Sequence, residues 1–125
     1  NLLLKLKNWS NGSMDVIKEQ KIDLPAEVAA QLVDIFTSYP EVEKVIIFGS
    51  RALGNAKPGS DVDCAFIGKD LTFQLVSRIQ NYLEEETLFP YFFDCVHLES
   101  TRNQELLEHI KIYGKILYEK KSMSD

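Results

Sequence analysis

Apolar and polar residues follow two different periods along this chain, and the two periods alternate. Apolar residues recur at helical spacing over 25–40, 71–86 and 101–114, which predicts three amphipathic helices. Asp70 is expected to cap the second helix, and Thr101 to open a capping box at the start of the third. Each predicted helix presents an apolar stripe that needs a surface to pack against.

Short runs rich in β-branched and aromatic residues lie between these helices and predict strands. They cover 42–48, 61–67, 91–98 and, as an edge strand, 116–118. Residues 51–54 fit one or two helical turns, and 55–60 are expected to form a loop. The alternation of elements predicts an α/β (α+β) fold, a small mixed β-sheet of three to four strands flanked by helices.

The length of 125 residues fits one domain, and 45% hydrophobic and 26% charged residues are typical of a soluble globular protein. We expect this single domain to span 14–125. Residues 1–13 precede Met14 and are interpreted as a leader or expression-derived segment, with a genuine amphipathic extension as the alternative.

Charge and cysteine content limit what the chain can bind. The net charge of −5 provides no positive field for a nucleic-acid polymer, and the apolar runs are too short to span a membrane. Cys64 and Cys95 lie in apolar segments without the spacing of a disulfide framework or a zinc site. His97 and His109 also lack metal-ligand spacing and are expected to be structural or surface residues. These features predict a reduced, cytoplasmic protein.

Gly49 and Ser50 lie between a predicted strand and a short helix. Glycine lets the backbone approach a ligand closely, and the free N–H groups that follow favour an anion. A Gly-Ser pair alone is more often a simple turn. Together with the acidic residues that follow, however, it predicts a grip for a polyphosphate.

Asp61 and Asp63 are two residues apart on a predicted strand, so their side chains leave the same face. Asp94 lies in the middle of the third strand, where burying an unpaired carboxylate is costly and a salt bridge to a local cation is the alternative explanation. If the two strands are neighbours, the three carboxylates converge and repel one another. Mg²⁺, which prefers oxygen ligands, would relieve that repulsion.

In order and spacing, these acids and the Gly-Ser pair resemble the signature of the DNA polymerase β-like nucleotidyltransferases. More narrowly, the chain over 24–118 is similar to the minimal nucleotidyltransferases (MNT). The resemblance implies that Gly49-Ser50 hold the triphosphate of ATP or a related nucleotide, and that Asp61 and Asp63 bind two Mg²⁺ ions. It further implies that Asp94 completes the metal site and helps to activate an acceptor hydroxyl group.

The chain departs from this family where an Arg-Gly pair often follows Gly-Ser-x-Ala, because Leu53 and Gly54 stand there. The nearest residues that could compensate phosphate charge are Arg51 and Lys57, and Ser60 is a further candidate for nucleotide binding. Cys64 replaces an aliphatic residue and is expected to lie in the core, turned away from the acidic face.

The resemblance also implies a partner, because minimal nucleotidyltransferases are paired with all-helical HEPN-type proteins. In such pairs the enzyme can act as the antitoxin by transferring AMP to a HEPN toxin. The sequence leaves open two alternatives, a non-catalytic nucleotide- and metal-binding subunit and transfer to a small molecule such as an antibiotic. It also leaves open a homo-oligomer.

Overall fold

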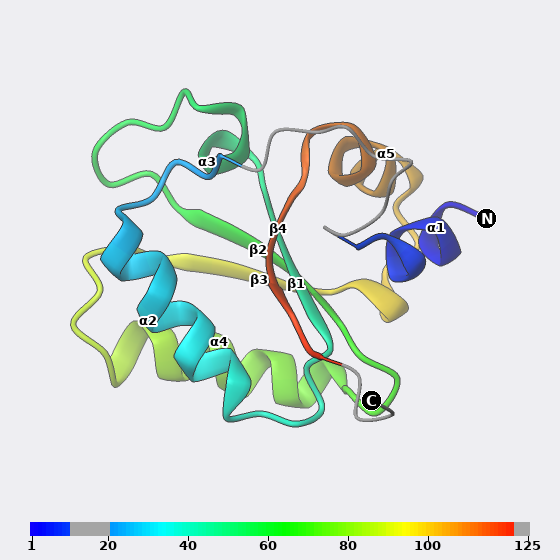
Figure 1. Ribbon diagram of the computed structural model, residues 1–125, viewed down its shortest axis with the longest axis horizontal. Coiled ribbons are helices and arrows are strands. Elements are labelled where there is room, and N and C mark those ends of the chain that lie inside the picture. Colours follow the sequence, from blue (N-terminus) through cyan, green and yellow to red (C-terminus); the bar gives the residue numbers. More distant parts are fainter. Residues whose placement is uncertain (11–20, 122–125) are drawn as a thin grey trace.

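The computed structural model describes residues 1–10 and 21–121 (Figure 1). Within these ranges the elements follow one another as α1 (Leu2–Asn8), α2 (Ala26–Thr37), β1 (Lys44–Phe48), α3 (Ser50–Leu53), β2 (Val62–Ile67), α4 (Phe73–Glu85), β3 (Phe93–His97), η1 (Leu98–Ser100), α5 (Gln104–Tyr113) and β4 (Lys115–Glu119). No helix in the described ranges is long and apolar enough to cross a membrane.

The four strands form one mixed sheet in the order β3-β2-β1-β4. β1 pairs antiparallel with both β2 and β4, whereas β2 pairs parallel with β3. Every residue of β1 is buried, because this strand lies between two others and is covered on both faces. The predicted fold class is therefore confirmed, and the short run near the C-terminus is an edge strand, as expected.

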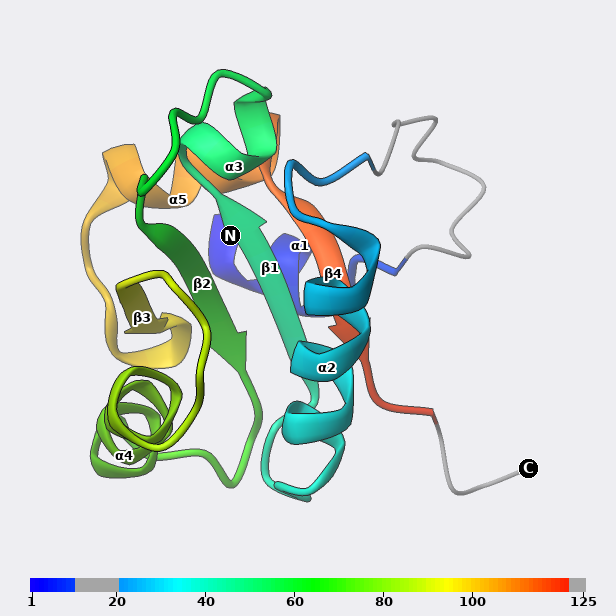
Figure 2. The ribbon, with the colours of Figure 1, turned by 90° about the vertical axis from the view of Figure 1, so that its left-hand side faces the viewer.

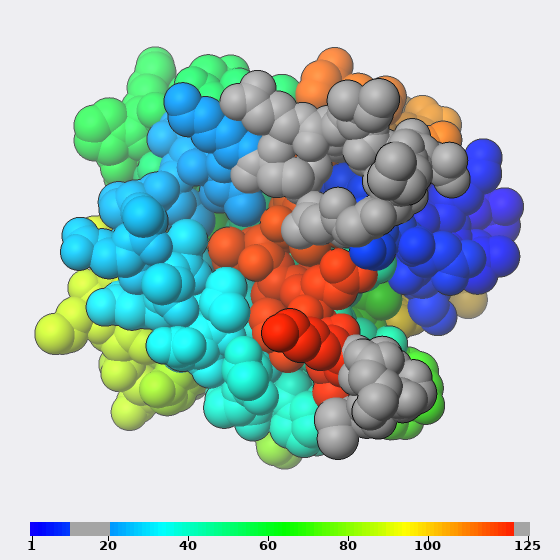
Figure 3. Space-filling model, in the orientation of Figure 1, coloured from blue at the N-terminus to red at the C-terminus, as the bar shows by residue number. Residues whose placement is uncertain are grey.

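Alternation along the strands divides the core into two clusters, one on each face of the sheet (Figure 2). Val45 and Ile47 pack on the face covered by α2 and α4, whereas Ile46 and Phe48 pack on the face covered by α1 and α5. The Phe36 and Phe66 rings meet edge to face in the first cluster, with centroids 5.2 Å apart. On the surface drawn in Figure 3, α2 and β4 lie side by side.

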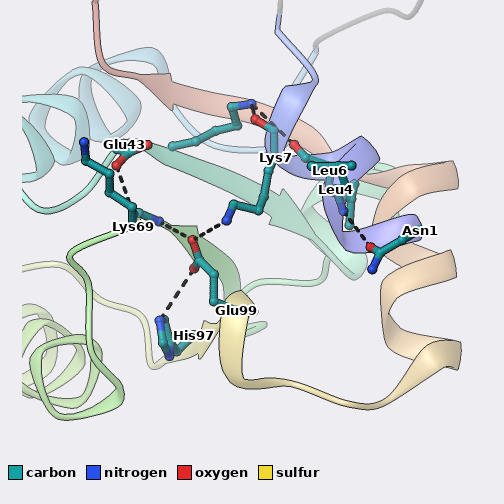
Figure 4. A network of polar contacts seen from close by, with 10 residues as sticks. Asn1, Leu4, Leu6, Lys7, Glu43, Lys69, His97 and Glu99 are labelled. Carbon is teal, nitrogen blue, oxygen red and sulfur yellow. Dashed lines mark hydrogen bonds and ion pairs between the residues drawn. The ribbon is translucent and has the colours of Figure 1, made fainter.

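Side-chain contacts fasten helix α1 to the sheet. The Lys44 ammonium group donates hydrogen bonds to the main-chain carbonyls of Leu6, Lys7 and Trp9, which lie at the C-terminal end of the helix. Burial lowers the pKa of Lys44, and the nearby acids oppose that effect. Glu99 adds an ion pair with Lys7 at 3.8 Å (Figure 4).

Residues 2–8, which fall in the segment interpreted as a leader, thus form part of the packed structure, whereas 11–13 and Met14 lie outside the described residues. The start of the domain at residue 14 stays a prediction.

Two predicted helix caps were wrong by two residues. Thr72 caps α4. A turn precedes it, in which the Leu71 N–H donates to the Gly68 carbonyl and Leu71 enters the core, so the helix starts two residues later than predicted. Asn103 caps α5, its side chain accepting from the Leu106 N–H at 3.1 Å, because a 3-10 turn over 98–100 delays the start of the helix.

Gly114 allows close packing where α5 turns into β4. A Cβ atom at Gly114 would lie 2.4 Å from the Ile110 carbonyl oxygen and 2.7 Å from Cγ2 of Ile46. We expect Gly114→Ala to lower the free energy of unfolding by about 1–3 kcal/mol, the usual cost of overpacking a core. Chemical denaturation should detect this loss, while Gln74→Ala on the exposed surface of α4 should stay within about 0.5 kcal/mol of the wild type. An unchanged midpoint for Gly114→Ala would show that the turn relaxes freely.

Candidate active site

Gly49 joins the end of β1 to the start of α3 in a conformation that favours glycine, with φ 69° and ψ −151°. A Cβ atom at this position would lie 2.1 Å from Oδ2 of Asp63. The sequence predicted that a ligand approaches Gly49 closely. In the structure, the Asp63 carboxylate of the chain itself lies this close to Gly49. Ser50 follows as the first residue of α3 and is half-buried. The structure therefore brings the predicted phosphate grip and the predicted metal-binding acid together.

Asp63 and Asp94 are direct partners in the parallel pairing of β2 with β3. Adjacent strands lie about 4.8 Å apart, and paired residues direct their side chains to the same face. Asp61 comes just before β2 and is exposed. Burial, followed by the charges of Asp94 and Asp61, raises the pKa of Asp63 to about 6. Asp94 and Asp61 thus lie close enough to Asp63 to oppose its ionisation.

Asp94 is exposed, so the expectation that its carboxylate is buried in the middle of a strand was wrong. The reason is the position of β3 at the edge of the sheet, which leaves this face of the strand open. Phe92 shares this alternation and is 70% exposed. Phe93, which points to the opposite face, is buried.

Side chains from α4 fix the outer edge of β3 on either side of Asp94. Oε2 of Glu84 accepts a hydrogen bond from the Phe93 N–H at 2.7 Å. One helical turn earlier, Oε1 of Gln80 accepts from the Cys95 N–H at 2.9 Å. These bonds satisfy two N–H groups that β2 cannot reach, and they hold the main chain of Asp94 in place.

The Arg51 side chain contacts other groups of the chain itself. Its buried guanidinium group donates to the main-chain carbonyls of Asp23 at 3.2 Å and Ser60 at 3.0 Å. It also lies over the Tyr91 ring, 4.9 Å from the centroid. These contacts give the Arg51 side chain a structural role, because it holds the loop that leads into Asp61, and contact of Arg51 with a nucleotide stays a prediction.

The other two loop candidates lie near the surface. The Ser60 hydroxyl accepts a hydrogen bond from the main-chain N–H of Lys57 at 2.9 Å, which closes the turn at Pro58 and Gly59. Lys57 is exposed, so its ammonium group is open to an incoming anion. Contact of Lys57 or Ser60 with a nucleotide stays a prediction.

His109 is the residue of this region that the sequence did not reveal. Its Nε2 atom accepts a hydrogen bond from the Gly49 N–H at 3.3 Å, and the ring packs on Phe48 and Tyr113. The contact spans 60 residues of sequence. The only local signal was its place in α5 near the inward-facing Ile110, which does not distinguish a site residue from a structural one.

The two cysteines occupy the opposite face of the sheet from Asp63, as predicted for Cys64. Both are free, and Cys64 is fully buried. A hydrogen bond with Cys64, together with burial, raises the pKa of the Cys95 thiol. Their placement gives them no part in the acidic site.

In the part of the chain that the structure describes, no group of three or more His, Cys, Asp or Glu residues is arranged so that it could hold a metal ion. The acids nevertheless fit a divalent cation in their chemistry. Oxygen ligands that raise one another's cost of ionisation are stabilised by a cation between them. The negative charges of Asp94 and Asp61 have this effect on the Asp63 carboxyl, whose pKa they raise in addition to the larger effect of burial.

The family described as "Polymerase beta, Nucleotidyltransferase" matches residues 30–123. The comparison with curated proteins gives no match.

Three similar solved structures come from toxin–antitoxin systems. One is a toxin–antitoxin with AMP-PNP, with 21% identity, 74% of each chain covered and a TM-score of 0.56. The second is the toxin–antitoxin MntA-HepT, with 18% identity, 77% of this chain and 74% of that chain covered and a TM-score of 0.60. The third is the tri-AMPylated Shewanella oneidensis HEPN toxin in complex with MNT antitoxin, with 19% identity, 74% and 70% covered and a TM-score of 0.50. At these identities the likeness shows a shared fold.

The buried position of Arg51 generates a testable contrast with Lys57. Arg51→Met keeps the length of the side chain but leaves two carbonyl groups without their donor, so we expect a loss of about 1–3 kcal/mol in the free energy of unfolding. Lys57→Met should change stability by less than about 0.5 kcal/mol. Denaturant melts of both variants measure this difference. A stable Arg51→Met protein with weakened nucleotide binding would support the interpretation of Arg51 as a ligand.

The raised pKa of Asp63 predicts how the stability of the metal-free protein depends on pH. Because the folded-state pKa lies above the unfolded one, the contribution of Asp63 is most favourable at about pH 4 and is lost as the pH rises through about 6. Asp63→Asn should therefore exceed the wild type in stability at about pH 8, by on the order of 1 kcal/mol once solvent screening is allowed for.

The advantage of Asp63→Asn should shrink toward about pH 4, where the wild-type carboxyl is protonated. Thermal melts across this range, in a chelating buffer, provide the measurement. Asp34→Asn on the exposed surface of α2 is the matched control. A constant difference between Asp63→Asn and the wild type at every pH would contradict the assignment.

Proposed function

Because the chain belongs to the polymerase beta nucleotidyltransferase family, we propose that it is a Mg²⁺-dependent enzyme that transfers AMP from ATP to a hydroxyl group of a partner protein. The observation that carries this proposal is the position of Asp63. Its carboxylate lies against Gly49 on one side, and Asp94 is its partner across the β2–β3 pair on the other. A phosphate grip, a metal-binding acid and a potential proton acceptor are therefore contiguous.

Each of these residues has a distinct role in the proposed reaction. Asp61, Asp63 and Asp94 would hold two Mg²⁺ ions, which supply charge neutralisation for the triphosphate. Gly49 and Ser50 hold the triphosphate close to the main chain. The acceptor oxygen bonds to the α-phosphorus, the bond to the β-phosphate oxygen breaks, and pyrophosphate leaves.

Asp94 is placed to take up the proton that the acceptor hydroxyl loses. Its side chain is exposed, so an acceptor outside the domain can reach it, whereas half-buried Asp63 is less accessible. A carboxylate in this position acts as a general base when it lies within hydrogen-bonding reach of the hydroxyl. The exposure that corrected the sequence-based expectation for Asp94 thus supports its proposed role.

A HEPN-type protein is the proposed acceptor. This proposal is supported by the similar solved structures, which are toxin–antitoxin systems that include a tri-AMPylated HEPN toxin. In the last helix and strand, Leu107, Ile110 and Ile116 are buried and cover the sheet. Ile112 and Tyr113 remain exposed at the end of α5 and are the residues available to a partner.

Intact-mass measurement tests the proposal. The purified protein is incubated with Mg²⁺, ATP and a HEPN-type partner protein, and the partner is expected to gain one or more AMP groups. Asp63→Asn should lose this transfer by at least about a hundredfold, since it removes a proposed metal ligand. Asp34→Asn, an exposed acid on α2, should keep it.

Two outcomes would redirect the assignment. Tight complex formation and Mg²⁺-dependent ATP binding without any mass gain would indicate a non-catalytic subunit. AMP transfer to a small molecule but to no protein would retain the nucleotidyltransferase and replace the acceptor.

A further inference from the structure

The Gly49 N–H group lies just beyond the hydrogen-bonded part of the sheet. The pairing of β1 with β4 runs only to Ile47, and its pairing with β2 ends at Phe48. A main-chain N–H at this point needs an acceptor from elsewhere, because an unpaired buried donor costs about 1–3 kcal/mol. Nε2 of His109 supplies that acceptor at 3.3 Å.

The imidazole ring of His109 is itself held from two sides. It meets the Phe48 ring edge on, with centroids 6.1 Å apart, and lies 5.1 Å from the Tyr113 ring one turn later in α5. The Gly114 turn then ties the end of α5 to the sheet through contact with Ile46. These contacts therefore fix the position of the Nε2 acceptor of His109. To accept at Nε2, the ring must be neutral with its proton on Nδ1.

We propose that His109 is a positioning residue for the nucleoside triphosphate. By accepting the Gly49 N–H it holds Gly49 in its positive-φ conformation, which in turn directs Ser50 toward the phosphates and keeps Asp63 packed against the Gly49 Cα. The ring retains this hydrogen bond when nucleotide binds, so the phosphates do not displace it. This inference rests on the proposed function, since it assigns the triphosphate to the Gly49-Ser50 turn.

The alternative is that the hydrogen bond is incidental and that His109 contributes only its ring to the core. Two substitutions separate these possibilities, because each keeps one property of histidine. His109→Gln keeps an acceptor at a similar reach and loses the ring, whereas His109→Phe keeps the ring and loses the acceptor. A positioning role predicts that Gln preserves function better than Phe, and a packing role predicts the reverse order.

The first measurement is ATP binding in the presence of Mg²⁺, by calorimetry. We expect His109→Phe to bind about tenfold more weakly and His109→Gln to stay within about twofold of the wild type, as the loss of one hydrogen bond implies. Thermal melts identify any variant that fails to fold. Equal or tighter binding by His109→Phe would overturn the proposal, because it would mean that the hydrogen bond is incidental and that His109 contributes only its ring to the core.

The second measurement does not depend on catalysis. Hydrogen exchange of the Gly49 amide, followed by NMR, should be slow in the wild type and in His109→Gln and at least about tenfold faster in His109→Phe. ATP should leave the amide protected in the wild type. Identical exchange in the wild type and His109→Phe would overturn the proposal. A wild type that transfers no AMP would contradict the proposed function. The comparison of Gly49 amide exchange between the wild type and the His109 variants would still decide the role of His109.

Discussion

The in-register parallel pairing of β2 with β3 is the constraint on which the candidate site depends. It sets Asp63 beside Asp94, and burial adds to the cost of charging Asp63. The strands cannot relieve this repulsion by sliding, because a shift of one residue would turn Cys64 and its neighbours out of the core. Hydrophobic packing on the opposite face thus keeps two like charges together. The destabilisation is local, and a cation can remove it.

Further contacts place the residues around this pair, one from nearby in the sequence and one from the last helix. Arg51 bonds to the carbonyl of Ser60 and so fixes the approach to Asp61. His109 reaches Gly49 from the last helix. Each contact satisfies a main-chain group that regular secondary structure leaves without a partner. The loop and the turn that flank the acids are thereby supported by buried or half-buried side chains.

The sequence predicted the parts of this arrangement that are local. The strand period indicated that Asp61 and Asp63 share a face, and the order of elements indicated a mixed sheet, which the structure confirms. The exposure of Asp94 could not be predicted in this way, because it follows from which strand occupies the edge. The structural contacts of Arg51 could not be predicted from the sequence for a related reason. A cation near a phosphate grip suggests a ligand, and only the three-dimensional path of the loop shows that carbonyl groups already occupy it.

The outer edge of β3 has a consequence for how other chains can approach. Glu84 and Gln80 occupy its N–H groups at Phe93 and Cys95, so an incoming extended segment would find these donors already used. Strand addition, a common way in which sheet edges recruit peptides, is therefore blocked beside Asp94. Under the proposed function, an acceptor protein would instead present its hydroxyl group end on, from a loop or a helix terminus, across the open face of β3. This geometry would favour acceptor proteins that carry a protruding segment over proteins that bind by adding a strand to the sheet.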